Sequence, residues 1–325
     1  DGIIVVDKPQ DCTSFDVVAA MRRLSGERKI GHTGTLDPMA TGVLPLLLGR
    51  ATRAASLLPD TGKTYEADFA LGQATDTQDS TGTVTARSGE PVSEERLSAA
   101  LPAFRGRIFQ TPPMYSAVRK NGRRLYELAR KGIEVEREKR PVTIFRLELL
   151  RYDEASRRGS LLVECSGGTY IRTLCSDLGG ALGSFGMMTG LRRTRAAGFA
   201  LSEAVTLEKA RSLSAAGELS SCLLPVERLF LSDPSVEVSG AQAARFLNGG
   251  PLALDRLPPH PRLSRQGSRF RVLSPEKRFL GLGAVDLEKQ ELVILKLFGE
   301  KVPKREGKSH KSCFGVMIPA CNDLA

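Results

Sequence analysis

The chain has 325 residues, which at about 150 residues per domain predicts two domains, or one large domain with an appendage. Hydrophobic residues make up 41% and charged residues 26%, and no run of 18 apolar residues occurs, so the composition indicates a globular protein and excludes a membrane-spanning one. The first six residues lack the basic flank and the cleavage site of a secretory leader, and the missing Met indicates a trimmed start. We therefore expect a cytoplasmic protein.

The charge balance favours a polyanionic partner. Lys and Arg number 47 and Asp and Glu number 37, a net charge of +10. Because a basic surface attracts polyanions, nucleic acid is the leading class of partner. The six cysteines form no C-x-x-C pair and only three histidines accompany them, so we predict no metal site and expect reduced, mostly buried thiols.

The N-terminal part predicts a buried strand and then an amphipathic helix. Residues 3–6 are all aliphatic, and Thr13-Ser14 offers a cap for the helix, which Ser25-Gly26 would end. The residues expected on the apolar face of this helix are Phe15, Val17, Val18, Met21 and Leu24.

A glycine-punctuated segment follows at residues 31–38. It is too broken for a helix and too polar for a core strand, so we predict a shaped loop. Residues 43–48 are continuously apolar and would anchor this loop against a buried element. Side chains that carry out chemistry on a rigid support are expected in such a place.

Beyond this loop, strands and helices mix without strict alternation. Apolar residues alternate from Thr64 to Leu71 and predict a half-exposed strand with Tyr65 on its apolar side. We expect further strands at residues 142–150 and 160–165 and helices at residues 93–101 and 170–182. This order predicts an α+β fold rather than a doubly wound one.

Residues 110–140 form a basic insert, which Pro112-Pro113 and Asn121-Gly122 mark as a protruding segment. A helix over residues 123–131, ended by Gly132, would bury Leu125, Leu128 and Ala129. The insert is either a surface that contacts RNA or a solvated charged face. The residues that we expect to contact an RNA backbone are Arg119, Lys120, Arg123, Arg124, Arg130 and Lys131.

A change of composition near residues 231–234 predicts a domain boundary. The first domain would span residues 1–232, and a small β-rich module would span residues 233–299, opening with a helix at residues 239–247. Strands of this module are expected near residues 270–273, 279–285 and 292–297. Residues 300–325 are basic and predict a disordered tail.

Asp37 differs from the other carboxylates because it lies in the shaped loop, near His32, rather than on a helix surface. It is either a turn aspartate that bonds its own backbone or a reactive carboxylate that needs a charged partner. The candidate partner is Arg172, which follows a strand and enters a helix at the rim of a sheet. An adjacent arginine would lower the carboxyl pKa and keep the group ionised. The glycine pair at residues 167–168 lacks the patterns of nucleotide-binding loops, so we predict no cofactor there.

Residues 31–45, GHTGTLDPMATGVLP, resemble the signature of the bacterial TruB family of tRNA pseudouridine synthases. Further motifs resemble the family in the same order, and the resemblance covers residues 2–230. These motifs are Asp7-Lys8-Pro9, Lys63-Thr64-Tyr65, Leu71-Gly72, Thr75-Asp76-Thr77, Gln110 with Pro112-Pro113, Tyr115-Ser116-Ala117, Gly168-Thr169-Tyr170-Ile171-Arg172 and Leu191-Arg192-Arg193-Thr194. The fold that the resemblance implies is a mixed, largely antiparallel sheet with flanking helices, followed by a PUA-like RNA-binding domain at residues 233–299.

The resemblance also implies an isomerase that converts the T-loop uridine at tRNA position 55 to pseudouridine without a cofactor. Asp37 would attack or deprotonate the ribose, Arg172 would pair with Asp37, and Tyr65 would stack on the flipped base and assist proton removal. The residues implied to contact the substrate nucleotide are His32, Tyr65, Tyr170 and Leu191. An extruded uridine needs an aromatic face and an apolar wall, since it loses its stacking partners.

In that family the insert closes on the T-loop, where Tyr115 and Tyr126 would pack on nucleotides or on each other. Two features depart from the family: Gly167 stands where many members have a lysine, and residues 300–325 resemble nothing in it. The missing lysine would weaken one phosphate contact.

The expected partner is therefore the T-arm of tRNA, with no membrane and no obligate protein partner, and the protein is expected to be a monomer. An alternative is a tRNA-binding folding factor whose catalysis is dispensable. A third hypothesis is that the protein is the catalytic subunit of a guide-RNA particle. The long basic insert disfavours this hypothesis, because a guided enzyme recognises its substrate through base pairing with the guide and does not need such an insert.

Overall fold

The computed structural model describes residues 1–59 and 61–299. The chain divides into two compact units, Asp1–Pro234 and Ser235–Ala325, close to the boundary expected after residue 232. The tail expected at residues 300–325 lies outside the described residues. Within the part of the chain that the structure describes, no helix combines the length and the apolar character needed to cross a membrane.

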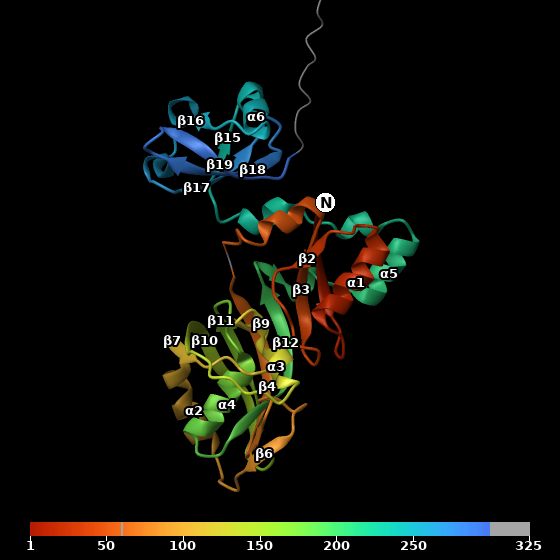
Figure 1. Cartoon of the computed structure of the whole chain (residues 1–325), viewed down its shortest axis with the longest axis vertical. Coiled ribbons are helices and arrows are strands. Elements are labelled where there is room, and N and C mark those ends of the chain that lie inside the picture. The colour runs from red at the N-terminus through yellow and green to blue at the C-terminus, as the bar shows by residue number, and fades with distance from the viewer. Residues whose placement is uncertain (60, 300–325) are drawn as a thin grey trace, which may run out of the picture. The chain divides into compact units, whose positions relative to one another are not determined.

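The first unit is built on a sheet to which the described residues contribute ten strands (Figure 1). Their order is β14-β1-β3-β12-β4-β11-β10-β7, with β2 paired to β3 and β13 paired to β12. The β1–β14 and β3–β12 pairs are parallel and the others antiparallel, which confirms the α+β fold with a mixed, largely antiparallel sheet. The strands are β1 (Gly2–Lys8), β2 (Ile30–His32), β3 (Thr41–Leu48), β4 (Lys63–Leu71), β7 (Gly106–Gln110), β10 (Arg140–Asp153), β11 (Arg158–Cys165), β12 (Gly186–Ala196), β13 (Phe199–Ala200) and β14 (Val205–Thr206).

Helices cover two separate parts of this sheet. In Figure 1, α1 and α5 lie side by side next to β2 and β3, whereas α4 packs on β12 and β4 and α2 contacts β10. The α-helices of this unit are α1 (Ser14–Ser25), α2 (Glu94–Ala100), α3 (Leu125–Ala129), α4 (Ile171–Ala181) and α5 (Leu207–Ala215). Short 3₁₀ helices connect the elements: η1 (Gly49–Ala54), η2 (Leu101–Phe104), η3 (Leu201–Glu203), η4 (Leu219–Cys222) and η5 (Val226–Phe230).

Helix α1 begins and ends where its sequence predicts. The Thr13 hydroxyl caps the first turn by accepting from the Asp16 amide, and Gly26 ends the helix in the left-handed region at φ 69°. The prediction that Phe15 belongs to the apolar face is wrong, because its side chain is 64% exposed. At 100° per residue, position 15 lies about 160° from Val17 around the helix, whereas Ser14 lies about 60° away and is buried instead.

The alternating strand predicted from Thr64 is β4. Tyr65, Ala67, Phe69 and Leu71 point to one side and are each at most 5% exposed. They pack in the main core with residues of α4, β10 and β11, which places Tyr65 at the edge of the hydrophobic core. The predicted strands at residues 142–150 and 160–165 lie within β10 and β11.

The segment at residues 31–38 is a loop only from residue 33 onward. Its first two residues belong to β2, which pairs with the end of β3, so the expectation of a loop from residue 31 was wrong at that end. A strand forms there because backbone pairing with an adjacent edge does not require apolar side chains. Gly42 is the second residue of β3 and has a φ of 103°. A Cβ on it would lie 2.2 Å from the Arg193 carbonyl oxygen, so only glycine lets β3 approach β12 this closely.

The basic insert contains a hairpin of β8 (Arg119–Lys120) and β9 (Arg123–Arg124), followed by α3. The predicted helix over residues 123–131 is therefore shorter, since its first two residues pair as a strand. Leu125 and Leu128 are buried as expected, and Ala129 is half-buried. A second hairpin, β5 (Gln73–Thr75) and β6 (Val84–Arg87), follows β4.

The described part of the second unit is a small sheet with one α-helix, α6 (Gly240–Leu247). Its strands follow the order β15-β17-β18-β19-β16, and its core contains Phe246 and Phe270. This is the β-rich module that the sequence predicts. The strands are β15 (Ser235–Glu237), β16 (Leu252–Ala253), β17 (Arg269–Leu273), β18 (Phe279–Asp286) and β19 (Glu291–Leu297), with 3₁₀ helices η6 (Leu254–Arg256) and η7 (Pro261–Ser264).

Candidate active site

A cavity of about 830 Å³ opens in the first unit beside the loop at residues 33–39. Its walls come from this loop, the start of β4, the β5–β6 hairpin, the N-terminal end of α4 and the basic insert. Segments far apart along the chain thus converge on one space, large enough for a small organic ligand. Among its lining residues are Asp37, Lys63, Tyr65, Asp79, Tyr170, Arg172 and Leu191.

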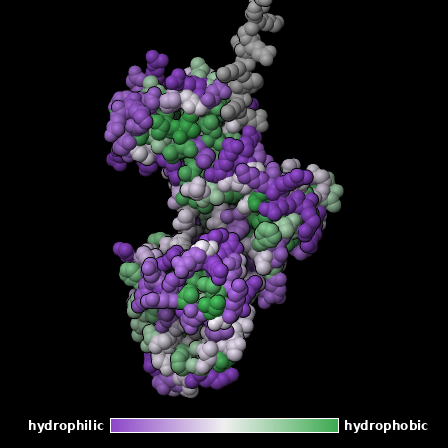
Figure 2. Space-filling view, viewed as in Figure 1, coloured by the Kyte–Doolittle hydropathy of each residue, from purple (hydrophilic) through white to green (hydrophobic). Residues whose placement is uncertain are grey.

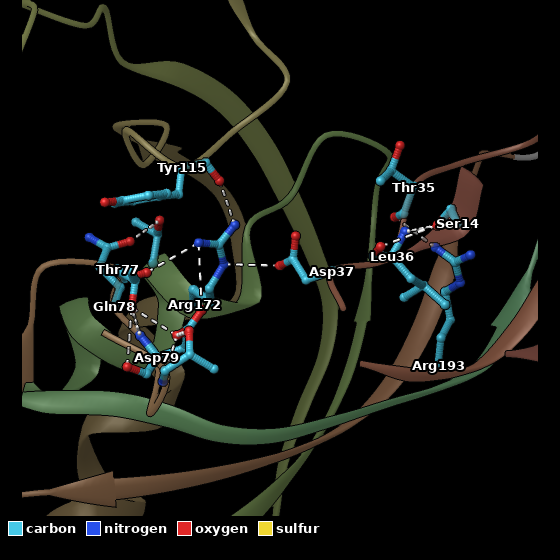
Figure 3. A network of polar contacts seen from close by, with 12 residues as sticks. Ser14, Thr35, Leu36, Asp37, Thr77, Gln78, Asp79, Tyr115, Arg172 and Arg193 are labelled. Atoms are coloured by element: carbon cyan, nitrogen blue, oxygen red, sulfur yellow. Dashed lines mark hydrogen bonds and ion pairs between the residues drawn. The ribbon is translucent and has the colours of Figure 1, made fainter. Parts of the chain in front are cut away.

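Asp37 and Arg172 form an ion pair in this cavity, 135 residues apart in sequence (Figure 3). The Arg172 Nε lies 3.0 Å from an Asp37 carboxylate oxygen. The Arg172 side chain is only 6% exposed, whereas that of Asp37 remains 39% exposed. Because Asp37 lines the cavity, the arginine lies in the wall and the carboxylate faces the open space.

The guanidinium of Arg172 is fixed on its other sides. Its Nη1 donates to the Thr77 carbonyl oxygen at 3.2 Å, and its Nη2 donates to the Tyr115 carbonyl oxygen at 2.8 Å. A second carboxylate, Asp79, lies 3.7 Å from Nη1. Figure 3 shows these partners on one side of Arg172 and Asp37 on the other. The planar fork of arginine suits such contacts in several directions, so Asp37 meets a donor of fixed position.

Asp79 is a site residue that the sequence did not single out. It is 5% exposed and accepts hydrogen bonds from the hydroxyls of Thr77 and Thr81, in a turn between β5 and β6. The sequence feature that could have identified Asp79 is its position two residues after the Thr75-Asp76-Thr77 motif. An aspartate in a turn that bonds to nearby hydroxyls is common, however, so this position alone predicts no role. Only the fold brings Asp79 close to Arg172.

Two buried cations anchor the backbone on either side of Asp37. The Lys8 ammonium donates to the Pro38 carbonyl oxygen at 3.2 Å. The Arg193 guanidinium donates to the carbonyl oxygens of Gly34, Thr35 and Val43 at 2.7 to 3.4 Å. Both side chains are fully buried. The sequence analysis placed Lys8 and Arg193 in family motifs but predicted no role for either residue. A buried charge is costly unless its donors are hydrogen-bonded, so these contacts would be costly to break. They therefore hold the loop in one conformation.

Burial raises the pKa of the Asp37 carboxyl above its ordinary value, and the adjacent Arg172 guanidinium opposes that shift. The lowering effect expected from the arginine is therefore present, but desolvation is larger. Asp79 adds a like charge that also raises the Asp37 pKa, and the Lys8 ammonium lowers it. The ionised state of Asp37 thus depends on the cations around it.

Tyr65 lies in the wall of the cavity and is 5% exposed. Burial raises the pKa of its phenol to about 12, against the opposing effect of Arg193. The hydroxyl is therefore protonated at neutral pH and is a hydrogen-bond donor. Leu191 and Tyr170 also line the cavity, and the Gln110 side chain fixes Tyr170 by bonding both its backbone amide and its carbonyl.

His32 lies in β2 and is not among the residues that line the cavity. Its Nδ1 is buried without a hydrogen-bond partner in the described part of the chain. The expected contact of His32 with a substrate nucleotide stays a prediction.

The six basic residues predicted to contact an RNA backbone are exposed, and one of them, Arg130, lines the cavity. The Tyr126 ring contacts the guanidinium groups of Arg124 and Arg130, whose central carbons lie 5.8 and 5.4 Å from the ring centre. Tyr126 and Tyr115 both line the cavity, and no ring contact joins them among the described residues.

Residues 1–59 and 61–299 contain no group of three or more His, Cys, Asp or Glu side chains able to bind a metal ion.

Three family models match this chain. The model of the N-terminal domain of the TruB family of pseudouridylate synthases matches residues 22–171. A tRNA pseudouridylate synthase B C-terminal domain matches residues 172–231, and a C-terminal domain of pseudouridine synthase II TruB matches residues 234–290. The chain belongs to the TruB family.

Relatives of this TruB-family protein are similar over nearly their whole length. Proteins named tRNA pseudouridine synthase B from Dechloromonas aromatica and Aeromonas salmonicida are 48% and 39% identical to it. The alignments cover 78% and 95% of this chain and 84% and 94% of the relatives. A chain in the crystal structure of a Cbf5-Nop10-Gar1 complex matches with a TM-score of 0.69 and 26% identity, over 92% of this chain and 84% of that one.

The effect of Arg172 on Asp37 can be measured directly. Replacing Arg172 with Gln removes the opposite charge, so the pKa of Asp37 should rise above its value in the unaltered protein, which itself should exceed 3.8. Arg172→Lys keeps the charge and should shift the pKa less. A pH titration of the Asp37 carboxyl carbon by ¹³C NMR measures all three values.

The control is Arg146→Gln, which removes an exposed arginine paired with Glu148 and should leave the Asp37 titration unchanged. An unchanged or lower Asp37 pKa in Arg172→Gln would show that the guanidinium does not favour the ionised carboxylate.

Proposed function

We propose that this TruB-family protein is a tRNA pseudouridine synthase, an isomerase that converts the T-loop uridine at tRNA position 55 to pseudouridine. The observation that carries the proposal is the Asp37–Arg172 ion pair, which presents a carboxylate to a cavity with an aromatic wall. A uridine packed in a folded tRNA reaches a recessed carboxylate only after extrusion from its stack. Tyr65 and Leu191 offer the aromatic and apolar surfaces that compensate for the lost stacking.

In the proposed reaction the bond between C1′ and N1 breaks, and its electron pair leaves with the uracil. Asp37 acts in one of two ways. Its carboxylate oxygen bonds to C1′, or it takes the proton from C2′ and a C1′=C2′ double bond forms. The detached uracil then rotates and bonds C1′ through C5. In the first route this bond displaces the Asp37 oxygen from C1′, and in the second route Asp37 returns its proton to C2′. In both routes the C5 proton is then lost and N1 regains a proton. Both routes need an ionised carboxylate, which Arg172 favours.

Tyr65 is proposed to stack on the base and to assist removal of the C5 proton. Its protonated hydroxyl would first act as a donor, since burial disfavours the phenolate. Tyr170 and Leu191 are proposed to contact the nucleotide. No step consumes a cofactor, because cleavage and rejoining exchange one bond of the ribose for another.

The exposed cations of the insert are proposed to contact phosphates of the T-arm. Figure 2 shows hydrophilic side chains gathered over the region of β9 and α3, around a small apolar patch. Neutralisation of phosphates by such side chains supplies affinity that does not depend on sequence. The second unit is proposed as an accessory RNA-binding module. We expect a monomeric, cytoplasmic enzyme without an obligate protein partner.

A tRNA-folding role is compatible with this arrangement, because the basic insert can bind RNA whether or not Asp37 reacts. The two roles differ in what they require of the carboxylate. A folding factor would work equally well with Asn at position 37.

Replacing Asp37 with Asn should lower the single-turnover rate of pseudouridine formation by at least about 10⁴-fold, the scale expected when a reacting group is lost. Binding of tRNA should stay within a few-fold, because the insert is unaltered. The substrate is an isolated T-arm hairpin, and the reaction contains no protein other than the enzyme and no other RNA. Pseudouridine is quantified by mass spectrometry after digestion of the hairpin.

The matched control is Asp255→Asn, an exposed carboxylate of the second unit, which should have full activity. Full activity of Asp37→Asn would refute the proposal that the protein is a pseudouridine synthase that uses Asp37. If the unaltered protein needed an added guide RNA, the proposal that it acts without a guide would be refuted.

The phosphate contacts of the insert predict a specific salt dependence. Replacing Arg123, Arg124, Arg130 and Lys131 together with Gln should reduce the slope of log affinity against log salt concentration by about 3, since each released phosphate contact contributes about 0.7 to 0.9. A variant that exchanges Arg and Lys at the same positions keeps the charge and should keep the slope. An unchanged slope in the Gln variant would show that these residues do not contact phosphates.

A further inference from the structure

Lys63 is a cavity residue to which neither the resemblance nor the proposed mechanism assigns a role. It is the first residue of β4 and precedes Tyr65 by two positions, so the two side chains project from the same face of the strand. Both line the cavity. The β4–β11 register places Cys165 opposite Lys63.

The Lys63 ammonium has no anionic partner within residues 1–59 and 61–299, where no ion pair or hydrogen bond of Nζ occurs. Its end lies close against the loop that carries Asp37, since a Cβ built on Gly34 would be 3.3 Å from Nζ. The Cys165 thiol does not balance the charge, because burial raises its pKa to about 11 and keeps it neutral.

A second cation lies beside Lys63. The same Cβ position on Gly34 would be 3.8 Å from an Arg193 nitrogen, and the Arg193 charge lowers the pKa of Lys63 in addition to the effect of burial. The hydrogen bonds of the Arg193 side chain go to the backbone carbonyls of Gly34, Thr35 and Val43, and the nearby Tyr65 phenol is neutral. Two like charges without a carboxylate at hydrogen-bond distance give this wall of the cavity a positive potential.

Figure 3 shows Arg193 and Arg172 on opposite sides of Asp37. The carboxylates of Asp37 and Asp79 contact Arg172, and neither forms an ion pair with Lys63 or Arg193 in the described part of the chain. The wall formed by Lys63 and Arg193 keeps an excess of positive charge, which suits a group that becomes negative during the reaction.

We propose that Lys63 is a catalytic residue, which donates a hydrogen bond to a uracil carbonyl oxygen and stabilises the uracil anion released when the C1′–N1 bond breaks. The inference rests on the proposed function. Whether Asp37 bonds to C1′ or takes the C2′ proton, the electron pair of the broken bond enters the uracil ring and spreads onto O2 and O4. A partly desolvated ammonium near these atoms stabilises the charge that develops in the transition state.

The position of Lys63 favours the base over a phosphate as its partner. Lys63 lies on the strand face that carries Tyr65, against which the base is proposed to stack, and burial makes its ammonium costly to leave unpaired. Phosphates of an extruded nucleotide stay in the backbone of the RNA, where the exposed cations of the insert are available to them.

The test compares Lys63→Met with the unaltered protein on a T-arm hairpin under single-turnover conditions. The rate should fall by about 10²- to 10³-fold, the loss expected when one donor to a developing anion is removed. Hairpin affinity and its salt slope should be unchanged. Lys63→Arg should recover part of the rate because it retains a charged donor. Lys209→Met, which removes an exposed lysine of α5, should have full activity.

Hairpins with 2-thiouridine or 4-thiouridine as the target identify the oxygen. The thio-substitution at that position should slow the unaltered protein and have a smaller effect on Lys63→Met, because the hydrogen bond is already absent. A weaker affinity with a reduced salt slope and an unchanged rate would overturn the proposal in favour of a phosphate contact. An unchanged rate together with unchanged affinity would overturn it outright.

The unaltered protein, run in parallel, separates this inference from the proposed function. If it forms pseudouridine and Asp37→Asn does not, a failure of the Lys63 prediction concerns Lys63 alone. Lys63→Leu, which also lacks a donor, replaces Lys63→Met if the methionine variant does not fold, as judged by its thermal unfolding, and the same losses are expected.

Discussion

The contact between the Asp37 carboxylate and the Arg172 guanidinium is the interaction on which this site depends. A carboxylate at the edge of a cavity loses part of its hydration, and burial alone raises its pKa toward the neutral form. The guanidinium opposes this effect at 3.0 Å and also sets the direction of the carboxylate. Without it, the group that is proposed to react would lose both its charge and its orientation.

Several buried cations make this contact possible. Lys8 and Arg193 bind backbone carbonyls of the loop on either side of Asp37, and Arg172 is bonded to the carbonyls of Thr77 and Tyr115. These bonds connect the loop, the β5–β6 hairpin, α4 and the insert. The precision of the site therefore comes from charged groups satisfied by backbone oxygens, each of which would be costly to bury alone.

Local patterns predicted the elements well and the site incompletely. Alternation identified β4 with Tyr65 inward, and capping residues gave the ends of α1, because these signals act over a few residues. The error at Phe15 arose because the apolar residues were grouped without regard to their angular positions around the helix axis. Segments that meet only in the folded chain have little local signal. The place of Arg172 at a strand-to-helix junction made it the candidate partner of Asp37, and the resemblance implied the same pairing. Asp79, and the Lys63 ammonium that has no anionic partner among the described residues, became visible only with the structure.

The central claim is that a uridine leaves its stack and enters the cavity with its ribose against residue 37. A crystal structure of the Asp37→Asn variant bound to a T-arm hairpin tests this claim most directly. The account predicts an extruded uridine whose base lies on Tyr65 and whose C1′ or C2′ is within about 3.5 Å of the Asn side chain, the separation of reacting atoms. A uridine still stacked in the T-loop, or a ribose outside the cavity, would contradict it.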